Sequence, residues 1–397
     1  MSNSFLPYGR HQIDDDDIEA VVDVLKNGAL TCGPKVDAFE QAFAEKIGAK
    51  HAVVCSNGTT ALHLAVLVAG VAGKVVVPSV TFLSTANVVR MAGADVVFAD
   101  VCPATGLMTA ASLKAALAKS DGNVSAVMPV HLNGQCAEMK EIAAIAKAAG
   151  AAVITDCCHA LGAEYTGETG GRPGDGQYED IGCFSLHPVK SIAMGEGGVV
   201  TTNNDTFARE LRLLRGHGMV REPEEWADSA AGFDADNGDA NPWYYEMQAL
   251  GYNYRATDMQ CALGLSQLRK LDRFIARRRE IAGLYDKLLG THSNMVVPIE
   301  RTNLASSAWH LYPVLIDFAR VGKSRAAVMK ALAEIGVGTQ VHYIPVSDQP
   351  YYRNLYGKQD LPGASDYYGK VLSLPIFPAM SDEDVHKVVD ALVKVLR

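Results

Sequence analysis

Short, uniformly apolar runs alternate with longer amphipathic segments through the first half of the chain. The apolar runs have the length of strands, whereas the segments between them have the apolar spacing of helices. The predicted strands are 52–55, 74–77, 95–99, 124–128 and 151–155, and the predicted helices between them are 60–68, 82–91, 110–118 and 137–149. Strands that are apolar on both faces indicate an α/β fold in which a mostly parallel sheet is sandwiched by helices.

The two ends of the chain extend this pattern. An N-terminal arm over 5–10 precedes a helix that Asp14 caps, and a second helix follows over 36–47. Beyond residue 255 the predicted elements are helices 257–279, 323–335 and 381–396 and strands 309–316 and 339–342. We therefore predict a large α/β domain over 1–255, then a linking helix and a smaller α+β domain over 256–397.

The composition fits a soluble globular protein. Of the 397 residues, 48% are apolar and 20% charged, and the net charge is −9 with a pI near 5.7. An acidic chain argues against nucleic acid or an anionic membrane as a partner, because both need a basic face. No apolar run reaches the ~18 residues of a membrane span, and the N-terminus lacks the pattern of a signal peptide.

The eight cysteines show no CxxC pair and no regular framework. Most lie in apolar runs, and the adjacent Cys157 and Cys158 would point to opposite faces of a strand. Reduced thiols in the core of a cytoplasmic protein therefore fit better than disulfides or zinc, and no metal site is predicted.

Lys190 lies in a polar turn between two apolar runs, 181–186 and 198–201, which have the pattern of buried strands. Glycines in this turn let the backbone come close to a ligand. Burial lowers the pKa of an amine, and a neutral amine can condense with an aldehyde. A surface lysine in a turn is the plain alternative, and for an arbitrary lysine it is the better one.

Polar residues after other strands should lie near Lys190, because ligands of parallel sheets bind beyond the carboxyl ends of the strands. The turn 56–60 opens a helix whose positive end suits phosphate, although such turns often only cap a helix. No Walker A or GxGxxG pattern occurs, which disfavours a nucleotide hydrolase or a dehydrogenase.

Asp156 ends a predicted buried strand, where a carboxylate needs a cationic partner. A protonated pyridine nitrogen is such a partner, and capping of the next helix is the alternative. His159 could bond a substituent of the same ring or be a structural histidine. Phe82, after the second strand, could stack on an aromatic ligand or belong to the core.

These pieces occur in the order and spacing of the DegT/StrS-type sugar aminotransferases, which the chain resembles over nearly its whole length. The matching motifs are Gly58-Thr59-Thr60, Phe82, Asp156-x-x-His159, Ser185-x-His187-Pro-x-Lys190, Gly195-Glu-Gly-Gly198 and Gly251-Tyr-Asn253-Tyr-Arg255. The resemblance implies a fold-type-I aminotransferase with pyridoxal 5′-phosphate bound as a Schiff base to Lys190. It further implies a pyridoxamine 5′-phosphate form and a homodimer with shared active sites.

By the same matching, Asp156 pairs with the pyridine nitrogen, His159 lies near the ring hydroxyl and Phe82 stacks on the ring. The family often has glutamine in place of His159. The implied phosphate contacts are Thr59, Thr60, Ser185 and, from the neighbouring subunit, Asn253. Some relatives replace the lysine with histidine and become sugar dehydratases, so Lys190 favours transamination. A dehydratase and a non-catalytic regulator are the alternatives.

Four further stretches, 158–165, 215–219, 309–313 and 341–345, resemble the aminotransferases of the pseudaminic-acid pathway. Those enzymes act on a UDP-linked 4-keto-6-deoxy-N-acetylhexose with L-glutamate as amino donor, so the expected partners are a nucleotide-linked keto sugar and L-glutamate. Transaminases of the GDP-perosamine or UDP-bacillosamine type are alternatives. The candidate substrate contacts are His187, His217, His342 and Tyr343, of which the last two could equally be interior packing.

Residues 221–250 form a long acidic insert relative to the family. It could be a lid over the sugar nucleotide, a dimer contact or a solvated loop.

Overall fold

The structure is a computed structural model that describes residues 5–167, 170–228, 230–292 and 295–397. These residues form a seven-stranded sheet in the order β1-β8-β7-β5-β4-β2-β3. The strands are β1 (His51–Cys55), β2 (Lys74–Pro78), β3 (Asp95–Ala99), β4 (Val124–Val127), β5 (Ala152–Asp156), β7 (Ile181–Ser185) and β8 (Gly198–Thr202). The strands from β7 to β3 are parallel, and β8 runs antiparallel to both of its neighbours. The predicted α/β class with a mostly parallel sheet is confirmed.

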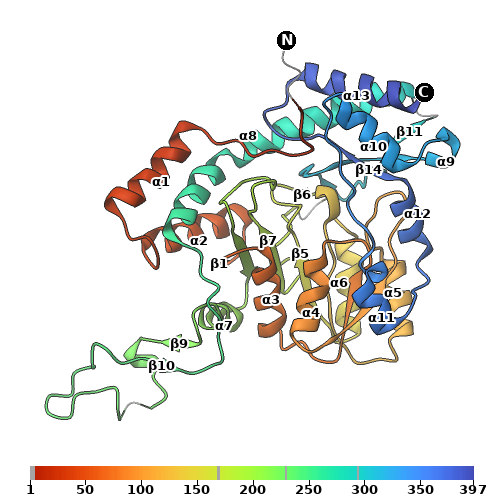
Figure 1. Cartoon of the computed structure of the whole chain (residues 1–397). Helices are drawn as coiled ribbons and strands as arrows, with labels where there is room; N and C mark the ends of the chain where they lie inside the picture. The colour runs from red at the N-terminus through yellow and green to blue at the C-terminus, as the bar shows by residue number, and fades with distance from the viewer. Residues whose placement is uncertain (1–4, 168–169, 229, 293–294) are drawn as a thin grey trace.

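Helices cover both faces of this sheet (Figure 1). The helices of one face are α2 (Pro34–Ile47), α5 (Ala110–Lys119) and α6 (Met139–Ala148), and those of the other are α3 (Gly58–Val68), α4 (Leu83–Met91) and α7 (Asp205–Arg215). Successive strand residues supply the two cores in turn, because side chains alternate along a strand: Val53 belongs to one core and Val54 to the other. This two-sided burial explains why the strands are apolar throughout.

The C-terminal part has its own antiparallel sheet, in the order β11-β13-β14. Its strands are β11 (Val296–Pro298), β13 (Tyr312–Ile316) and β14 (Val371–Leu374). Its helices are α9 (Phe318–Val321), α10 (Arg325–Glu334), α11 (Pro350–Tyr356), α12 (Pro362–Lys370) and α13 (Asp382–Leu396). The long helix α8 (Asp258–Leu289) joins this part to the large sheet (Figure 1). The domain boundary predicted after residue 255 lies just before α8 and stays a prediction.

Three expectations for the C-terminal half were wrong. The linking helix does not end at residue 279 but continues to Leu289, because buried Ile281, Tyr285 and Leu289 prolong its apolar stripe. Residues 339–342 form no strand, since Gln340 makes an isolated bridge to Ser373. The strand predicted from residue 309 begins at Tyr312, as β13.

The insert 221–250 projects from the body of the molecule (Figure 1). The pair β9 (Met219–Val220) and β10 (Glu246–Met247) forms its base, and the rings of Trp226, Phe233 and Tyr244 pack together within it. The insert thus has aromatic packing contacts of its own. The remaining short elements are β6 (Glu164–Tyr165), β12 (Ala305–Ser306) and the 3₁₀ turns η1 (Leu132–Gly134), η2 (Pro223–Glu225), η3 (Gly290–His292) and η4 (Val346–Asp348).

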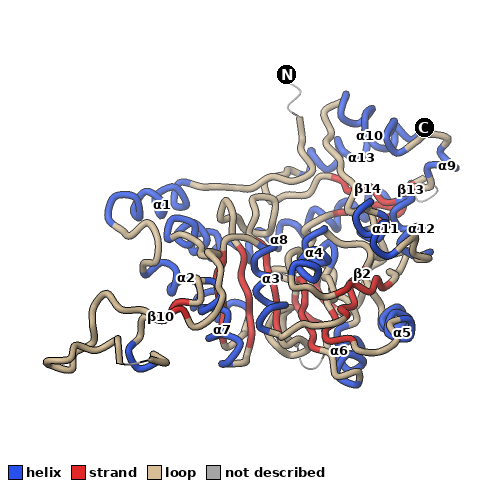
Figure 2. Tube along the Cα trace, turned by 60° about the horizontal axis from the view of Figure 1, so that its bottom comes forward, coloured by secondary structure: helices blue, strands red, loops and turns tan. Residues whose placement is uncertain are grey.

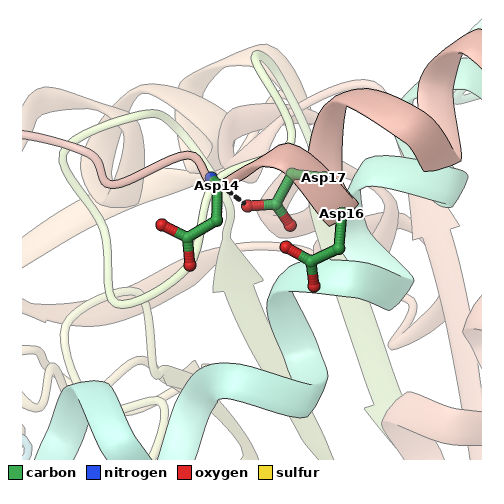
Figure 3. Close-up of side chains that lie close together, drawn as sticks. All are labelled: Asp14, Asp16 and Asp17. Atoms are coloured by element: carbon green, nitrogen blue, oxygen red, sulfur yellow. Dashed lines mark hydrogen bonds between the residues drawn. The ribbon is translucent and has the colours of Figure 1, made fainter.

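Helix α1 (Asp15–Asn27), seen at one edge of the tube in Figure 2, begins with three clustered carboxylates, those of Asp14, Asp16 and Asp17 (Figure 3). The ammonium of Lys270, on α8, lies 3.3, 2.6 and 2.7 Å from their oxygens. Because this ammonium already supplies the counter-charge, the three carboxylates hold α1 against α8 by ion pairs, and we assign no metal to them. Among the residues that the structure describes, none of the helices combines the length and apolarity needed to cross a bilayer.

Candidate active site

A cavity of about 840 Å³ lies beyond the carboxyl ends of the parallel strands. The turns that follow β1, β2, β4, β5 and β7 line it on the side of the large sheet. Residues 340–344 of the C-terminal part and Tyr8 of the N-terminal arm complete the wall. The predicted convergence of these turns near Lys190 is therefore observed.

The turn after β1 forms the phosphate end of this cavity. Asn57 caps α3 by accepting a hydrogen bond from the backbone N–H of Thr60, and the Thr60 hydroxyl bonds back to Asn57. The Thr59 hydroxyl lies 2.6 Å from that of Ser84. The hydroxyls and the positive end of α3 together suit a dianion.

Two glycines let this turn approach its neighbours. A Cβ on Gly58 would lie 2.7 Å from that of Ser185, and a Cβ on Gly198 would lie 2.1 Å from a backbone oxygen of the turn. Ser185 and the lysine loop are therefore packed directly against the helix N-terminus.

Asp156 ends β5 and is only 5% exposed. One carboxylate oxygen accepts a hydrogen bond from the Thr85 hydroxyl at 2.8 Å, and the other accepts one from the backbone N–H of Cys158 at 3.0 Å. These bonds fix the carboxylate and leave it without a bonded cationic side chain among the described residues, so a cationic ligand nitrogen can fill that role.

Lys190 lies on the loop between the antiparallel strands β7 and β8 and lines the same cavity as Asp156. Burial lowers the pKa of its amine, and the negative charge of Asp156 partly opposes that shift. The amine is therefore more readily neutral than that of an exposed lysine, as condensation with an aldehyde requires.

His159 is largely buried but is itself one of the residues that line the cavity, and both of its ring nitrogens have hydrogen-bond partners. Its Nδ1 accepts a hydrogen bond from the backbone N–H of Asn133, and its Nε2 lies 3.3 Å from the Tyr343 hydroxyl. Its ring packs against that of His310 with centroids 4.3 Å apart. Burial lowers the pKa of His159 well below its usual value, with a further contribution from the charge of Lys190. The imidazole is therefore a neutral hydrogen-bonding group.

The other predicted residues divide into two groups. Phe82, His187, His342 and Tyr343 line the cavity with the residues above. His217 and Asn253 are exposed and lie outside the cavity of their own chain, as do the described residues of the insert 221–250. A lid formed by the insert 221–250 over the cavity of its own chain is therefore not supported.

Sequence reasoning missed several polar residues of the site. Thr85 holds Asp156, Ser84 meets Thr59, and Asn133 and His310 surround His159. The partners are distant in sequence, as with Thr85 and Asp156, which are 71 residues apart. No local motif links such pairs.

The cavity fits pyridoxal 5′-phosphate by the chemistry of its donors. It offers an amine of lowered pKa, a buried acid, a helix N-terminus with hydroxyls, and an exposed Phe82 ring at its wall. Lys190 would hold the aldehyde, Asp156 the ring nitrogen, and Thr59 and Ser185 the phosphate.

Comparisons with known proteins agree with this chemistry. Residues 11–393 match the DegT/DnrJ/EryC1/StrS aminotransferase family. The chain is 38% identical over 400 residues to the spore coat polysaccharide biosynthesis protein SpsC of Bacillus subtilis, covering 100% of this chain and 98% of that protein. It is 36% identical over 392 residues to the UDP-4-amino-4,6-dideoxy-N-acetyl-beta-L-altrosamine transaminase of Campylobacter jejuni, covering 98% of this chain and 97% of that one.

Solved structures give the same answer. Helicobacter pylori PseC, an aminotransferase involved in the biosynthesis of pseudoaminic acid, aligns with a TM-score of 0.87 and 27% identity over 99% of both chains. The PLP-form of the putative sugar aminotransferase Spr1654 of Streptococcus pneumoniae aligns with a TM-score of 0.85 and 25% identity over 99% of this chain and 98% of that one. The resemblance noted in the sequence is confirmed: the chain belongs to the DegT/DnrJ/EryC1/StrS aminotransferase family.

Proposed function

We propose that the protein uses pyridoxal 5′-phosphate to move the amino group of L-glutamate to C4 of a nucleotide-linked 4-keto-6-deoxy sugar. The observation that carries this proposal is the meeting of Lys190, Asp156 and the α3 N-terminus in one cavity. The named activity of the Campylobacter jejuni relatives supports a UDP-linked 2-acetamido-2,6-dideoxy-4-ketohexose, UDP-2-acetamido-2,6-dideoxy-beta-L-arabino-hex-4-ulose, as the sugar substrate.

The residues divide the work by their chemistry. Bound pyridoxal 5′-phosphate would supply an electron sink for the negative charge that forms on carbon. Asp156 would hold the ring nitrogen and keep it protonated, because its buried carboxylate would gain a cationic partner only in that form. The Nζ of Lys190 takes a proton from the α-carbon of the amino donor and later gives one to C4 of the sugar. Phe82, which lines the cavity, would cover one face of the bound ring and exclude water from it.

A second copy of the chain completes the proposed site. Among the described residues that line the cavity, Lys190 is the one lysine or arginine, whereas a cofactor phosphate and a nucleotide diphosphate need several cationic or amide donors. Asn253 is exposed and lies outside the cavity of its own chain, and the insert 221–250 exposes the apolar side chains of Trp243, Met247 and Leu250. We expect a homodimer in which these surfaces meet the partner and Asn253 reaches the partner's phosphate site.

The activity test is a screen of purified, cofactor-loaded protein with L-glutamate against UDP-, GDP- and dTDP-linked 4-keto-6-deoxy sugars. The expected result is 2-oxoglutarate in equal amount to an aminated sugar, best with the UDP sugar and absent in Lys190→Ala. Two half-reactions on one site predict ping-pong kinetics. A dehydratase would change the sugar without consuming glutamate, and a regulator would bind it without turnover; either result would refute transamination.

The shared site has a separate test. Lys190→Ala and Asn253→Ala proteins are each expected to be poorly active alone. Mixed dimers of the two carry one site with both native residues, so mixing after mild dissociation should restore up to about a quarter of the wild-type activity. A monomer by light scattering, or no recovery on mixing, would refute the shared site while leaving the chemistry intact.

A further inference from the structure

The turn η1, after β4, fixes the tautomer of His159. A backbone N–H can only donate, so the Asn133 N–H must meet an unprotonated Nδ1, and the proton of the neutral imidazole is then on Nε2. The turn is held in place: Asn133 has a φ of 64°, and a Cβ on Gly134 would lie 2.6 Å from the backbone nitrogen of Trp309. The main chain of the large domain therefore sets which way His159 donates.

The tautomer of His159 in turn fixes the hydrogen-bonding role of Tyr343. The Nε2–H of His159 faces the Tyr343 hydroxyl at 3.3 Å, so the tyrosine oxygen accepts and its own hydrogen remains free to donate. Tyr343 lines the cavity, and its ring lies 5.9 Å from that of Phe82. The bonds thus run in one direction, from the Asn133 amide through His159 to a hydroxyl donor at the cavity wall.

The surroundings keep both groups neutral. Burial raises the pKa of Tyr343, and the negative charge of Asp156 raises it further. Burial lowers the pKa of His159, with a further contribution from the charge of Lys190, and burial keeps the neighbouring His310 and His342 neutral as well. Neither His159 nor Tyr343 therefore changes protonation near neutral pH.

The sheet order indicates which ligand atom the relay meets. Asp156 ends β5, the phosphate cradle lies on the side of β1 and β7, and the turn that holds His159 follows β4 on the other side. In pyridoxal 5′-phosphate the phosphate arm and the ring oxygen flank the aldehyde carbon on opposite sides. A ring with its phosphate in the cradle and its nitrogen at Asp156 therefore turns its oxygen toward His159 and Tyr343.

We propose that Tyr343 donates a hydrogen bond to the ring oxygen of the cofactor and is oriented for this by His159 and the backbone of Asn133. This inference rests on the proposed function, because it requires pyridoxal 5′-phosphate in the cavity. It deepens that function by giving Tyr343, first predicted only as a substrate contact, a place on the cofactor. His159 then acts mainly as a positioning residue.

The proposal predicts a spectroscopic shift. When the nitrogen that joins Lys190 to the cofactor loses its proton, the ring oxygen carries a full negative charge. A neutral hydrogen-bond donor to the ring oxygen stabilises this deprotonated state. Tyr343→Phe should therefore raise the pH midpoint of the visible cofactor band by about one to two pH units, the size expected for losing a hydrogen bond to a charged group. Tyr352→Phe is the matched control, because its hydroxyl bonds Asn87 and does not line the cavity.

Variants of His159 test the orientation. Glutamine can accept from the Asn133 amide and donate onward, so His159→Gln should keep the midpoint near the wild-type value. His159→Leu keeps the Tyr343 hydroxyl but frees it to turn, so a smaller upward shift is expected. Nitrogen NMR of the cofactor-free protein should show His159 as the Nε2–H tautomer, without titration from pH 5.5 to 9.

Two results would overturn the proposal: an unmoved midpoint in folded Tyr343→Phe, or an Nδ1–H tautomer of His159. A wild-type protein that forms no visible band with pyridoxal 5′-phosphate would instead refute the proposed function, and with it the ring-oxygen contact. The NMR result would still report on the relay, so the two failures are distinguishable.

Discussion

Arg278 gives the sharpest test of how the two parts of the chain are joined. It lies on α8, is 1% exposed, and its Nη1 donates to the carbonyl oxygens of Trp309, His310 and Ile376 at 3.1, 3.2 and 3.0 Å. Burial lowers its pKa to about 10, so it is still charged at neutral pH. One cation thus binds two segments of the C-terminal part, residues 309–310 and Ile376.

Methionine at this position keeps much of the volume but removes every donor. Because Nη1 has two hydrogens, the three carbonyls share about two charge-assisted bonds of about 1.5–3 kcal/mol each. Methionine loses both, and relief of the buried charge returns part of that sum. We expect Arg278→Met to lower the free energy of unfolding by about 3–5 kcal/mol. With about 2.1 cal/mol/K of unfolding entropy per residue, this corresponds to about 4–6 °C in Tm.

The assay is thermal and urea unfolding followed by far-UV circular dichroism. Arg273→Met is the matched control on the same helix, since the Arg273 side chain is 62% exposed and makes one ion pair, with Asp14 at 3.0 Å. Such a surface pair contributes about 0–1 kcal/mol. Equal losses in the two variants, or an unchanged Tm in Arg278→Met, would refute the reasoning.

Three further predictions concern the site and its support. The rate at which cofactor-free protein develops the visible band with pyridoxal 5′-phosphate should rise with pH and level off below 10.5, because burial lowers the pKa of Lys190; a rise that continues past 10.5 would contradict this. Gly198→Ala should weaken cofactor binding at least about tenfold in a fluorescence titration, since its Cβ overlaps fixed backbone, whereas Gly195→Ala meets no atom within 4 Å and should cost only about 1 kcal/mol of backbone strain. Asp17→Asn should lower the free energy of unfolding by about 1–3 kcal/mol, measured in urea at pH 7. Burial alone would raise the pKa of Asp17, but hydrogen bonds such as that from Lys270 lower it overall. The difference from wild type should therefore shrink as the pH falls below 3.8.

Most of the large domain could be predicted from the sequence because each buried strand is a short apolar run with a clear end. The strand 95–99 was predicted residue for residue, and α1 begins after the predicted cap Asp14. The strand order could not be predicted, since it depends on long-range pairing. The C-terminal part was less predictable: β14 follows directly on helix α12, and its sequence Val-Leu-Ser-Leu has no period of its own.

The same distinction holds for the site. Lys190 and Asp156 could be found because each follows a recognisable strand and carries chemistry that a turn rarely needs. The residues that orient them could not, because Thr85 and Asn133 act through contacts that only the folded sheet creates. His217 shows the opposite limit: it lies in a motif shared with the family, yet it is outside the cavity of its own chain, and its role stays a prediction.

The reversed strand β8 also determines when a growing chain can first bind its ligand. β1 leaves the ribosome early, but its neighbour in the sheet is β8, and the turn after β1 is closed by Ser185 and Gly198. A nascent chain shorter than about 200 residues therefore lacks both the back wall of the phosphate end and the lysine loop. On the proposed function, the phosphate of pyridoxal 5′-phosphate therefore finds its complete binding site only after that edge of the sheet has been translated.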